Sequence, residues 1–114
     1  MRSRIGALAL LSVPLAFAWA VGARAVAEPT PARQAELAYI VRQDCGSCHG
    51  LRFKGGLGPA ILPENLKGKS TEALARVILE GVPGTAMPPW RPILAEDEAA
   101  WIARSLQKGF PDAP

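Results

Sequence analysis

The feature that most restricts this chain is the run Cys45-Gly46-Ser47-Cys48-His49, which holds both cysteines and the one histidine of its 114 residues. On a helix, residues three and four apart project to the same side, so both thiols and the imidazole would face a common partner. The C-x-x-C-H spacing is typical of covalent haem c attachment. We therefore expect Cys45 and Cys48 to form thioethers to one haem, and His49 to be an axial ligand of its iron.

Other uses of this motif fit less well. A structural zinc site needs four ligands, whereas the chain has three cysteine and histidine residues in total. A thioredoxin-like redox pair needs a βαβ setting, and the sequence shows no convincing strand pattern. A plain disulfide would leave the adjoining histidine without a role.

A second iron ligand is expected from the methionines. Met1 is the initiator, so Met87 is the remaining soft ligand. It lies in residues 82–92, where four prolines in eleven residues fix φ and oppose helix and sheet. A stiff loop can hold a weak ligand at low entropic cost. We therefore expect Met87 to be the second axial ligand, with core filler as the alternative role.

The N-terminus has the pattern of a secretory signal peptide. Two arginines within the first four residues precede an uncharged stretch over residues 5–23, and residues 25–27 (Ala-Val-Ala) offer a cleavage site. We predict a signal peptide over residues 1–27 and one domain over residues 28–114. Cleavage after Ala25 is the close competitor, and a retained segment of this length could instead anchor the chain in a membrane.

Charge and size restrict the mature domain further. Removal of the predicted signal peptide takes three of the 13 basic residues and leaves ten basic against ten acidic ones. A domain without net positive charge lacks the main electrostatic attraction to the phosphates of nucleic acid. A domain this small is also near the lower limit that one apolar core can stabilise, so we expect the haem to supply part of the core.

Apolar periodicity predicts three main helices. They span residues 30–48, 70–80 and about 95–108, and the first delivers the haem motif at its C-terminal end. The glycines and prolines of residues 51–69 predict a loop. The fold class is thus all-α, with three helices and their loops around one covalently bound haem. The residues expected to be buried are Leu37, Ile40, Val41, Cys45 and Cys48 in the first helix, Leu74, Val77 and Ile78 in the second, and Trp101, Ile102 and Leu106 in the third.

Individual residues mark the helix ends. Thr30 and Ser70 are candidate N-caps, and Gly81 and Gly109 are expected to end the second and third helices. Ala95 stands where a serine or threonine cap often opens the last helix, so that start is the least well defined.

The haem motif, the Gly58-Pro59 step, the methionine loop and the terminal helix together resemble class I cytochromes c. A closer resemblance, to the cytochrome c-55X or NirC type, is carried by residues 45–59 (CGSCHGLRFKGGLGP) and 84–92 (GTAMPPWRP). The resemblance implies the class I cytochrome c fold. It also implies that the Pro59 carbonyl accepts a hydrogen bond from the second ring nitrogen of His49, which would fix the imidazole.

The resemblance further implies a periplasmic electron carrier found beside the haem d1 nitrite reductase of denitrifying bacteria. Its partners would be redox proteins, such as that reductase or the factors that mature its haem d1. We expect no nucleic-acid partner, and contact with a membrane only if the N-terminal segment is retained. We expect no enzyme activity, because the histidine and both thiols are already committed. The alternatives are a role in haem d1 maturation and an open-site haem enzyme from whose iron Met87 is absent.

Two further residues are candidates for the haem environment. Trp90 and Arg91 follow the methionine loop and could donate hydrogen bonds to a haem propionate. A solvated Arg91 is the alternative.

Overall fold

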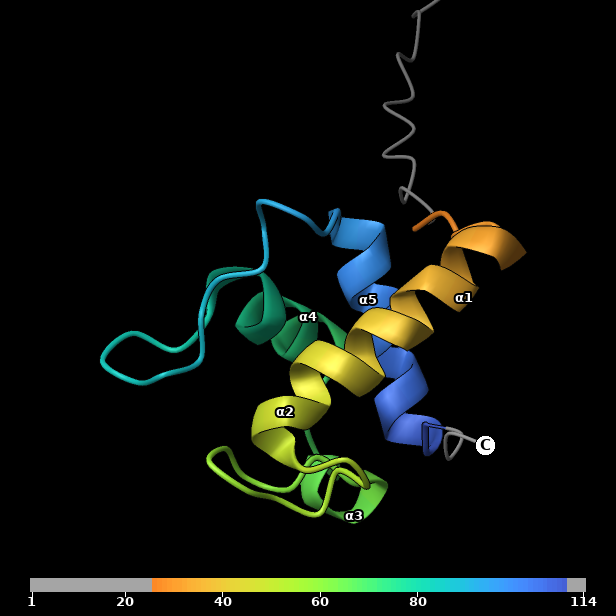
Figure 1. Ribbon diagram of the computed structural model, residues 1–114. Coiled ribbons are helices and arrows are strands. Elements are labelled where there is room, and N and C mark those ends of the chain that lie inside the picture. The colour runs from red at the N-terminus through yellow and green to blue at the C-terminus, as the bar shows by residue number, and fades with distance from the viewer. Residues whose placement is uncertain (1–25, 111–114) are drawn as a thin grey trace, which may run out of the picture.

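The computed structural model describes residues 26–110, and over this range every regular element is helical (Figure 1). The three main helices are α1 (Pro31–Ile40), α4 (Thr71–Glu80) and α5 (Glu96–Lys108). A π-helical turn, η1 (Val41–Cys45), and a short helix, α2 (Gly46–His49), continue α1. The all-α prediction is confirmed. Apart from its last two residues, the predicted signal peptide lies outside the described residues.

The predicted helix ends are confirmed to within about one residue. The side chains of Thr30 and Ser70 each accept a hydrogen bond from the backbone N–H three residues later, at 3.3 and 3.1 Å. Gly81 follows α4 directly. Ala95 precedes α5 without a side-chain oxygen to offer, but its own N–H donates to Oε2 of Glu98 at 2.9 Å. This half of a capping box supports the helix start.

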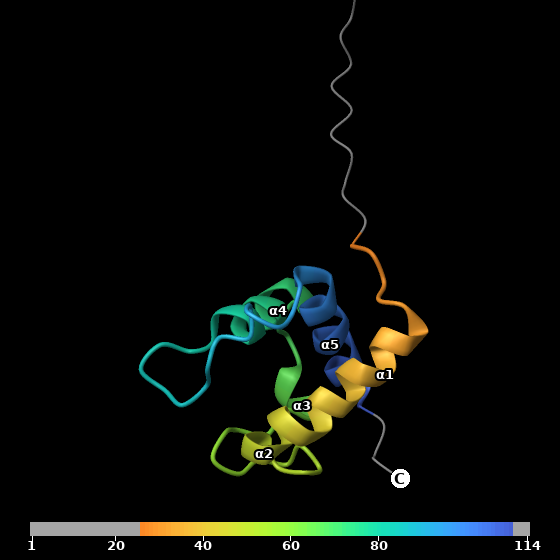
Figure 2. The ribbon, with the colours of Figure 1, turned by 45° about the horizontal axis from the view of Figure 1, so that its top comes forward.

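The core lies where α1 crosses α5 and where α4 packs against α5 (Figures 1 and 2). The small side chains of Ala99 and Ala103 of α5 are fully buried, as are Leu37 of α1 and Val41 of η1. Small residues on one helix let a second helix approach closely, and these two alanines lie one turn apart on α5. The remaining buried residues are Phe53, Leu66, Ala75, Leu79, Leu94, Ile102 and Leu106.

The predicted buried face of α4 needs correction. Ala75 and Leu79 form its buried line, Leu74 and Ile78 are half-buried against the core, and Val77 is 44% exposed. Since α-helical residues advance by about 100°, Val77 points nearly opposite to residues two positions before and after it. Of the three residues predicted for this face, Leu74 and Ile78 lie against the core and Val77 does not, and the prediction missed the buried pair Ala75 and Leu79.

The first helix also differs from its prediction. The N–H of Gly46 bonds to the carbonyl of Val41, five residues back, so the helix widens for one turn before the haem motif. This turn rotates the following residues relative to an α-helix. Cys45, which ends the widened turn, is only partly buried, whereas Leu37 and Val41 are completely buried.

Residues 51–69 were predicted as loop, but they contain the short helix α3 (Pro63–Leu66). A proline is favourable at the first helical position because its missing N–H would have no helical partner there. The carbonyl of Leu62 accepts from the N–H groups of Asn65 and Leu66, and Leu66 is buried. The density of glycine and proline concealed this single turn.

An aromatic cluster joins the end of α5 to the loop after α2. The ring of Phe110 packs edge-on against Phe53, at 5.9 Å between centroids, and against Trp101, at 6.2 Å. Trp101 is half-buried and packs against the core, as its predicted core role requires. The cluster therefore holds the haem-motif loop against the C-terminal helix.

Within the described residues, the helices are all too short or too polar to cross a membrane. The apolar segment of residues 5–23 lies outside the described residues.

A charged pair ties the first turn of α5 to α1. Nε and a terminal nitrogen of Arg33 donate to the two carboxylate oxygens of Glu98, at 2.6 and 3.3 Å. The hydrogen bond from Arg33, together with that from the Ala95 N–H, lowers the pKa of Glu98. The carboxylate thus stabilises the fold above its unfolded pKa of about 4.3, and this contribution is lost as pH falls through its lower folded pKa.

We predict that Glu98→Gln lowers the melting temperature by a few degrees at pH 7. The difference from wild type should shrink as pH falls below about 4.3, because Glu98 is protonated first in the unfolded chain and then, at its lower folded pKa, in the folded protein. Circular dichroism melts between pH 7 and pH 3 measure this. Glu72→Gln, in the first turn of α4, is the matched control, since Glu72 forms no ion pair among residues 26–110. A difference that persists unchanged at pH 3 would contradict the prediction.

Candidate haem site

The haem motif occupies the last turn of the first helical rod. Cys45 ends η1, and Cys48 and His49 end α2, so all three lie within a little more than one turn. Both cysteines are free thiols and partly exposed. The hydroxyl of Ser47 donates to the Asp44 carbonyl at 2.7 Å, which closes the turn between them. The two thiols and the imidazole are therefore presented together at one helix end.

The loop after α2 folds back onto the motif. The N–H groups of Gly55 and Gly58 donate to the carbonyls of His49 and Cys48, at 2.7 and 2.8 Å. These carbonyls end a helix and would otherwise lack backbone partners. Phe53 is buried in this loop at φ +56, a left-handed conformation that is rare for a side chain of its size. The loop is thus fixed to the turn that carries the motif.

Pro59 fixes the imidazole of His49. The Pro59 carbonyl lies 2.7 Å from Nδ1 of the ring, and a carbonyl oxygen can only accept. Nδ1 is therefore the donor, which leaves the lone pair of Nε2 for a metal. A Cβ on Gly58 would lie 2.9 Å from Cε1 and Nδ1 of the same ring, so the glycine backbone packs directly against the imidazole.

Burial raises the pKa of the Cys45 thiol to about 11, with a smaller contribution from the charge of Asp44. The thiol is consequently protonated at neutral pH, which disfavours the reactive thiolate of a redox-active cysteine pair. Zinc has no ready ligand set either, because no three His, Cys, Asp or Glu side chains gather suitably within residues 26–110.

Met87 lies in the loop of residues 82–92 and is half-buried. The Thr85 hydroxyl donates to the Val82 carbonyl at 2.7 Å and accepts from the Met87 N–H at 3.3 Å. The Val82 N–H donates to the Met87 carbonyl at 3.2 Å. The methionine backbone is thus held from both sides by its own loop.

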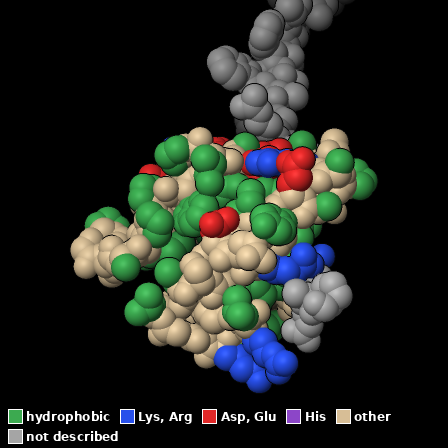
Figure 3. Space-filling model, in the orientation of Figure 1, with side chains coloured by type: hydrophobic (Ala, Val, Ile, Leu, Met, Phe, Trp, Pro, Cys, Tyr) green, Lys and Arg blue, Asp and Glu red, His purple; other side chains and the backbone are tan. Residues whose placement is uncertain are grey.

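The two loops project from the helices on the same side. In Figures 1 and 2, residues 82–92 and the loop after α2 extend toward the left and lower left of the molecule. In Figure 3 hydrophobic side chains gather around the notch between them. A flat apolar cofactor attached to α2 would find apolar surroundings there.

Trp90 and Arg91 lie where the methionine loop returns to α4. Their N–H groups donate to the carbonyls of Ile78 and Leu79, both at 3.2 Å. The guanidinium of Arg91 pairs with Glu80, through Nε at 2.8 Å and through a terminal nitrogen, and more weakly with Glu96 at 3.4 Å. These carboxylates already occupy the Arg91 donors considered for a propionate, so the structure favours a role for Arg91 in loop anchoring.

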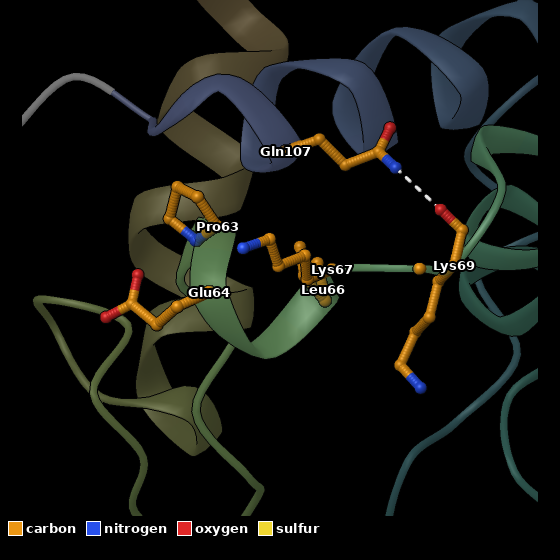
Figure 4. A pocket seen from close by; sticks show the side chains of 7 residues that line it. Pro63, Glu64, Leu66, Lys67, Lys69 and Gln107 are labelled. Carbon is orange, nitrogen blue, oxygen red and sulfur yellow. Dashed lines mark hydrogen bonds between the residues drawn. The ribbon is translucent and has the colours of Figure 1, made fainter.

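A hollow of about 470 Å³ lies elsewhere, between α3, the following turn and Gln107 of α5 (Figure 4). Gln107 Nε2 donates across one side of it to the Lys69 carbonyl at 2.9 Å. None of Cys45, Cys48, His49 and Met87 lines it. It is therefore separate from the residues that carry the haem chemistry.

The donor set fits haem c. Two free thiols stand three residues apart. In the adjacent imidazole of His49, Nδ1 donates to the Pro59 carbonyl, which leaves Nε2 available. A thioether lies in a braced loop on the same side of the molecule. Sequence reasoning identified these residues but did not assign a role to the crowded backbones at Gly58 and Gly81, because glycine contacts leave no pattern in a sequence.

Residues 32–104 match the family described as cytochrome c oxidase, cbb3-type, subunit III. The match begins in α1 and ends in α5, and it therefore includes the haem motif and the methionine loop.

Closely similar whole proteins are cytochromes c55X. The protein of that name from Paracoccus denitrificans (strain Pd 1222) is 56% identical over 101 residues, covering 89% of this chain and 93% of the relative. A solved structure titled c-type cytochrome NirC is 51% identical, with a TM-score of 0.71, and covers 75% of this chain and 100% of that one. The likeness thus extends over nearly complete proteins.

A larger protein contains a similar unit. The dihydro-heme d1 dehydrogenase of Pseudomonas aeruginosa is 32% identical over 102 residues, which are 90% of this chain but 20% of that protein. The solved structure of a dihydro-heme d1 dehydrogenase, NirN, gives a TM-score of 0.59 at 34% identity and covers 67% of this chain and 16% of that one.

We predict that Cys45→Ala/Cys48→Ala prevents stable folding, because the variant cannot retain a covalent haem and so lacks part of its core. Circular dichroism melts and the intact mass of the purified protein measure both effects. Ser47→Ala changes the same turn without removing a thiol, and it should keep haem and fold. A haem-free double variant with native helicity and a cooperative melt would contradict the prediction.

Proposed function

This chain belongs to the cytochrome c55X, or NirC, type of class I cytochromes c, and from that premise we propose that it carries single electrons in the periplasm through one covalently bound haem c. Bound haem supplies the one-electron couple between ferric and ferrous iron. The observation that carries the proposal is the 2.7 Å contact of His49 Nδ1 with the Pro59 carbonyl, beside two free thiols.

In this proposal each site residue has one task. Cys45 and Cys48 attach the cofactor, and His49 presents Nε2 to the iron while Pro59 holds its ring orientation. Met87 would provide a thioether as a second ligand, and methionine ligation raises the reduction potential of haem iron. The contacts of Pro59 with His49 and of Thr85 with the Met87 backbone would help to hold one ligand set in place.

The surface beside the motif supports brief docking with redox proteins. Leu51 and Leu57, in the loop after α2, are 79% and 91% exposed. Exposed apolar residues next to a cofactor favour transient contacts, and electron-transfer encounters use small interfaces. The charged side chains of the same loop, Arg52 and Lys54, are also exposed. No substrate pocket is needed for this function.

We place the protein in the haem d1 nitrite reductase system of denitrification, with that reductase or its maturation factors as partners. Support comes from the cytochromes c55X and from the structure titled NirC. The likeness to part of a dihydro-heme d1 dehydrogenase favours a second candidate, which is a role in haem d1 maturation. Export through a signal peptide over residues 1–27 is part of the same proposal.

Met87→Leu tests the iron ligation. The variant should lose the long-wavelength ferric absorption band that the family resemblance associates with methionine-bound iron, bind carbon monoxide when ferrous, and have a lower reduction potential. Ile93→Ala removes an exposed apolar side chain just beyond the loop and should change none of these. If wild-type protein lacks the band and already binds carbon monoxide, the open-site enzyme is favoured instead.

Deletion of the gene separates the two candidate roles. We expect lower nitrite reductase activity in cells, with full haem d1 content in the purified reductase, because electron supply and not cofactor assembly is lost. Activity assays and pigment extraction measure the two quantities. A reductase that lacks haem d1 would contradict the carrier role and support maturation.

A further inference from the structure

Gly81 ends α4 in a conformation and an environment that both require glycine. Its φ is +67° with ψ −170°, a region essentially restricted to glycine. It is also buried, and its N–H donates to the Val77 carbonyl at 2.9 Å. Ending a helix explains the positive φ. It does not explain what lies against the residue.

The backbone of the methionine loop lies against Gly81. A Cβ at this position would be 2.6 Å from the Met87 carbonyl oxygen, 2.7 Å from the carbonyl carbon of Pro88 and 2.8 Å from the nitrogen of Pro89. All three atoms belong to the main chain, so no side-chain rotation could relieve the overlap. A β-carbon would have to push the loop away from α4.

The loop has few other means of holding this segment. Pro88 and Pro89 have no N–H to donate. The nearest backbone hydrogen bonds are those from Val82 to the Met87 carbonyl and from Trp90 to the Ile78 carbonyl, both at 3.2 Å. Between these two anchors, close packing on Gly81 fixes how near the methionine backbone lies to the end of α4.

We propose that Gly81 is a positioning residue for Met87: its missing side chain lets the Met87–Pro89 backbone sit against α4, which sets the reach of the sulfur toward the iron. The inference rests on the proposed ligation of haem iron by Met87. The methionine is a weak ligand on a short loop, so a displaced backbone would lengthen or break the bond to iron.

The chain offers a matched control in the same loop. Gly84 also has a positive φ, +78°, but nothing lies within 4 Å of where its Cβ would be. Alanine at either position strains the backbone, whereas only alanine at Gly81 meets the methionine segment. The two variants therefore distinguish conformational strain from displacement of the ligand.

The test compares holoprotein of wild type, Gly81→Ala and Gly84→Ala, well below their melting temperatures. Gly81→Ala should lose most of the methionine-type ferric band, bind carbon monoxide when ferrous, and have a lower reduction potential. Gly84→Ala should keep the wild-type band and potential even if its melting temperature falls equally. A wild-type band and potential in Gly81→Ala would overturn the inference, as would equal spectral loss in both variants.

Failure of the proposed function gives a different result. It shows as a wild-type spectrum that Met87→Leu does not change, whatever the glycine variants do. If Gly81→Ala yields no holoprotein, a glycine inserted after Gly84 lengthens the loop so that it can move off α4. Recovered holoprotein would support the inference, and failure to recover it would assign the defect to the end of α4 and overturn it.

Discussion

The structure depends on how the loop after α2 is fixed to the turn that carries the haem motif. The carbonyls of Cys48 and His49 accept from loop N–H groups, and the loop returns a carbonyl, from Pro59, to the imidazole. The same few residues therefore complete a helix end and select one tautomer of His49. The contacts that end the helix and the contact that orients His49 thus come from one loop, so a change in that loop would affect both.

The two candidate ligands of the iron are held by different physical means. His49 is fixed by hydrogen bonds and by the backbone of Gly58 against its ring. Met87 lies in a loop where prolines remove donors, so the loop is held by hydrogen bonds at its two ends and by packing on Gly81 between them. An imidazole is a strong ligand and a thioether a weak one. The weaker ligand thus depends more on a stiff backbone.

Sequence reasoning succeeded where local chemistry decides the outcome. Thr30 and Ser70 cap their helices because a side-chain oxygen and a free N–H suffice. It failed where tertiary packing decides: nothing local to Val41 shows that the helix widens there, and the exposure of Val77 depends on which face α5 covers. Contacts of Gly58 and Gly81 were equally hidden, because they involve segments brought together only by the fold.

The helical scaffold and the haem-side loops contribute different parts of one small domain. Ala99 and Ala103 of α5 are fully buried, and the Arg33–Glu98 pair joins the first turns of α1 and α5. Helix α2, which ends in His49, and the loop of residues 82–92, which carries Met87, lie away from the crossing of α1 and α5 (Figure 1). Changes in the methionine loop can therefore alter a candidate ligand without touching that crossing. A scaffold of this kind can also be reused, which fits its similarity to one fifth of a much larger dehydrogenase.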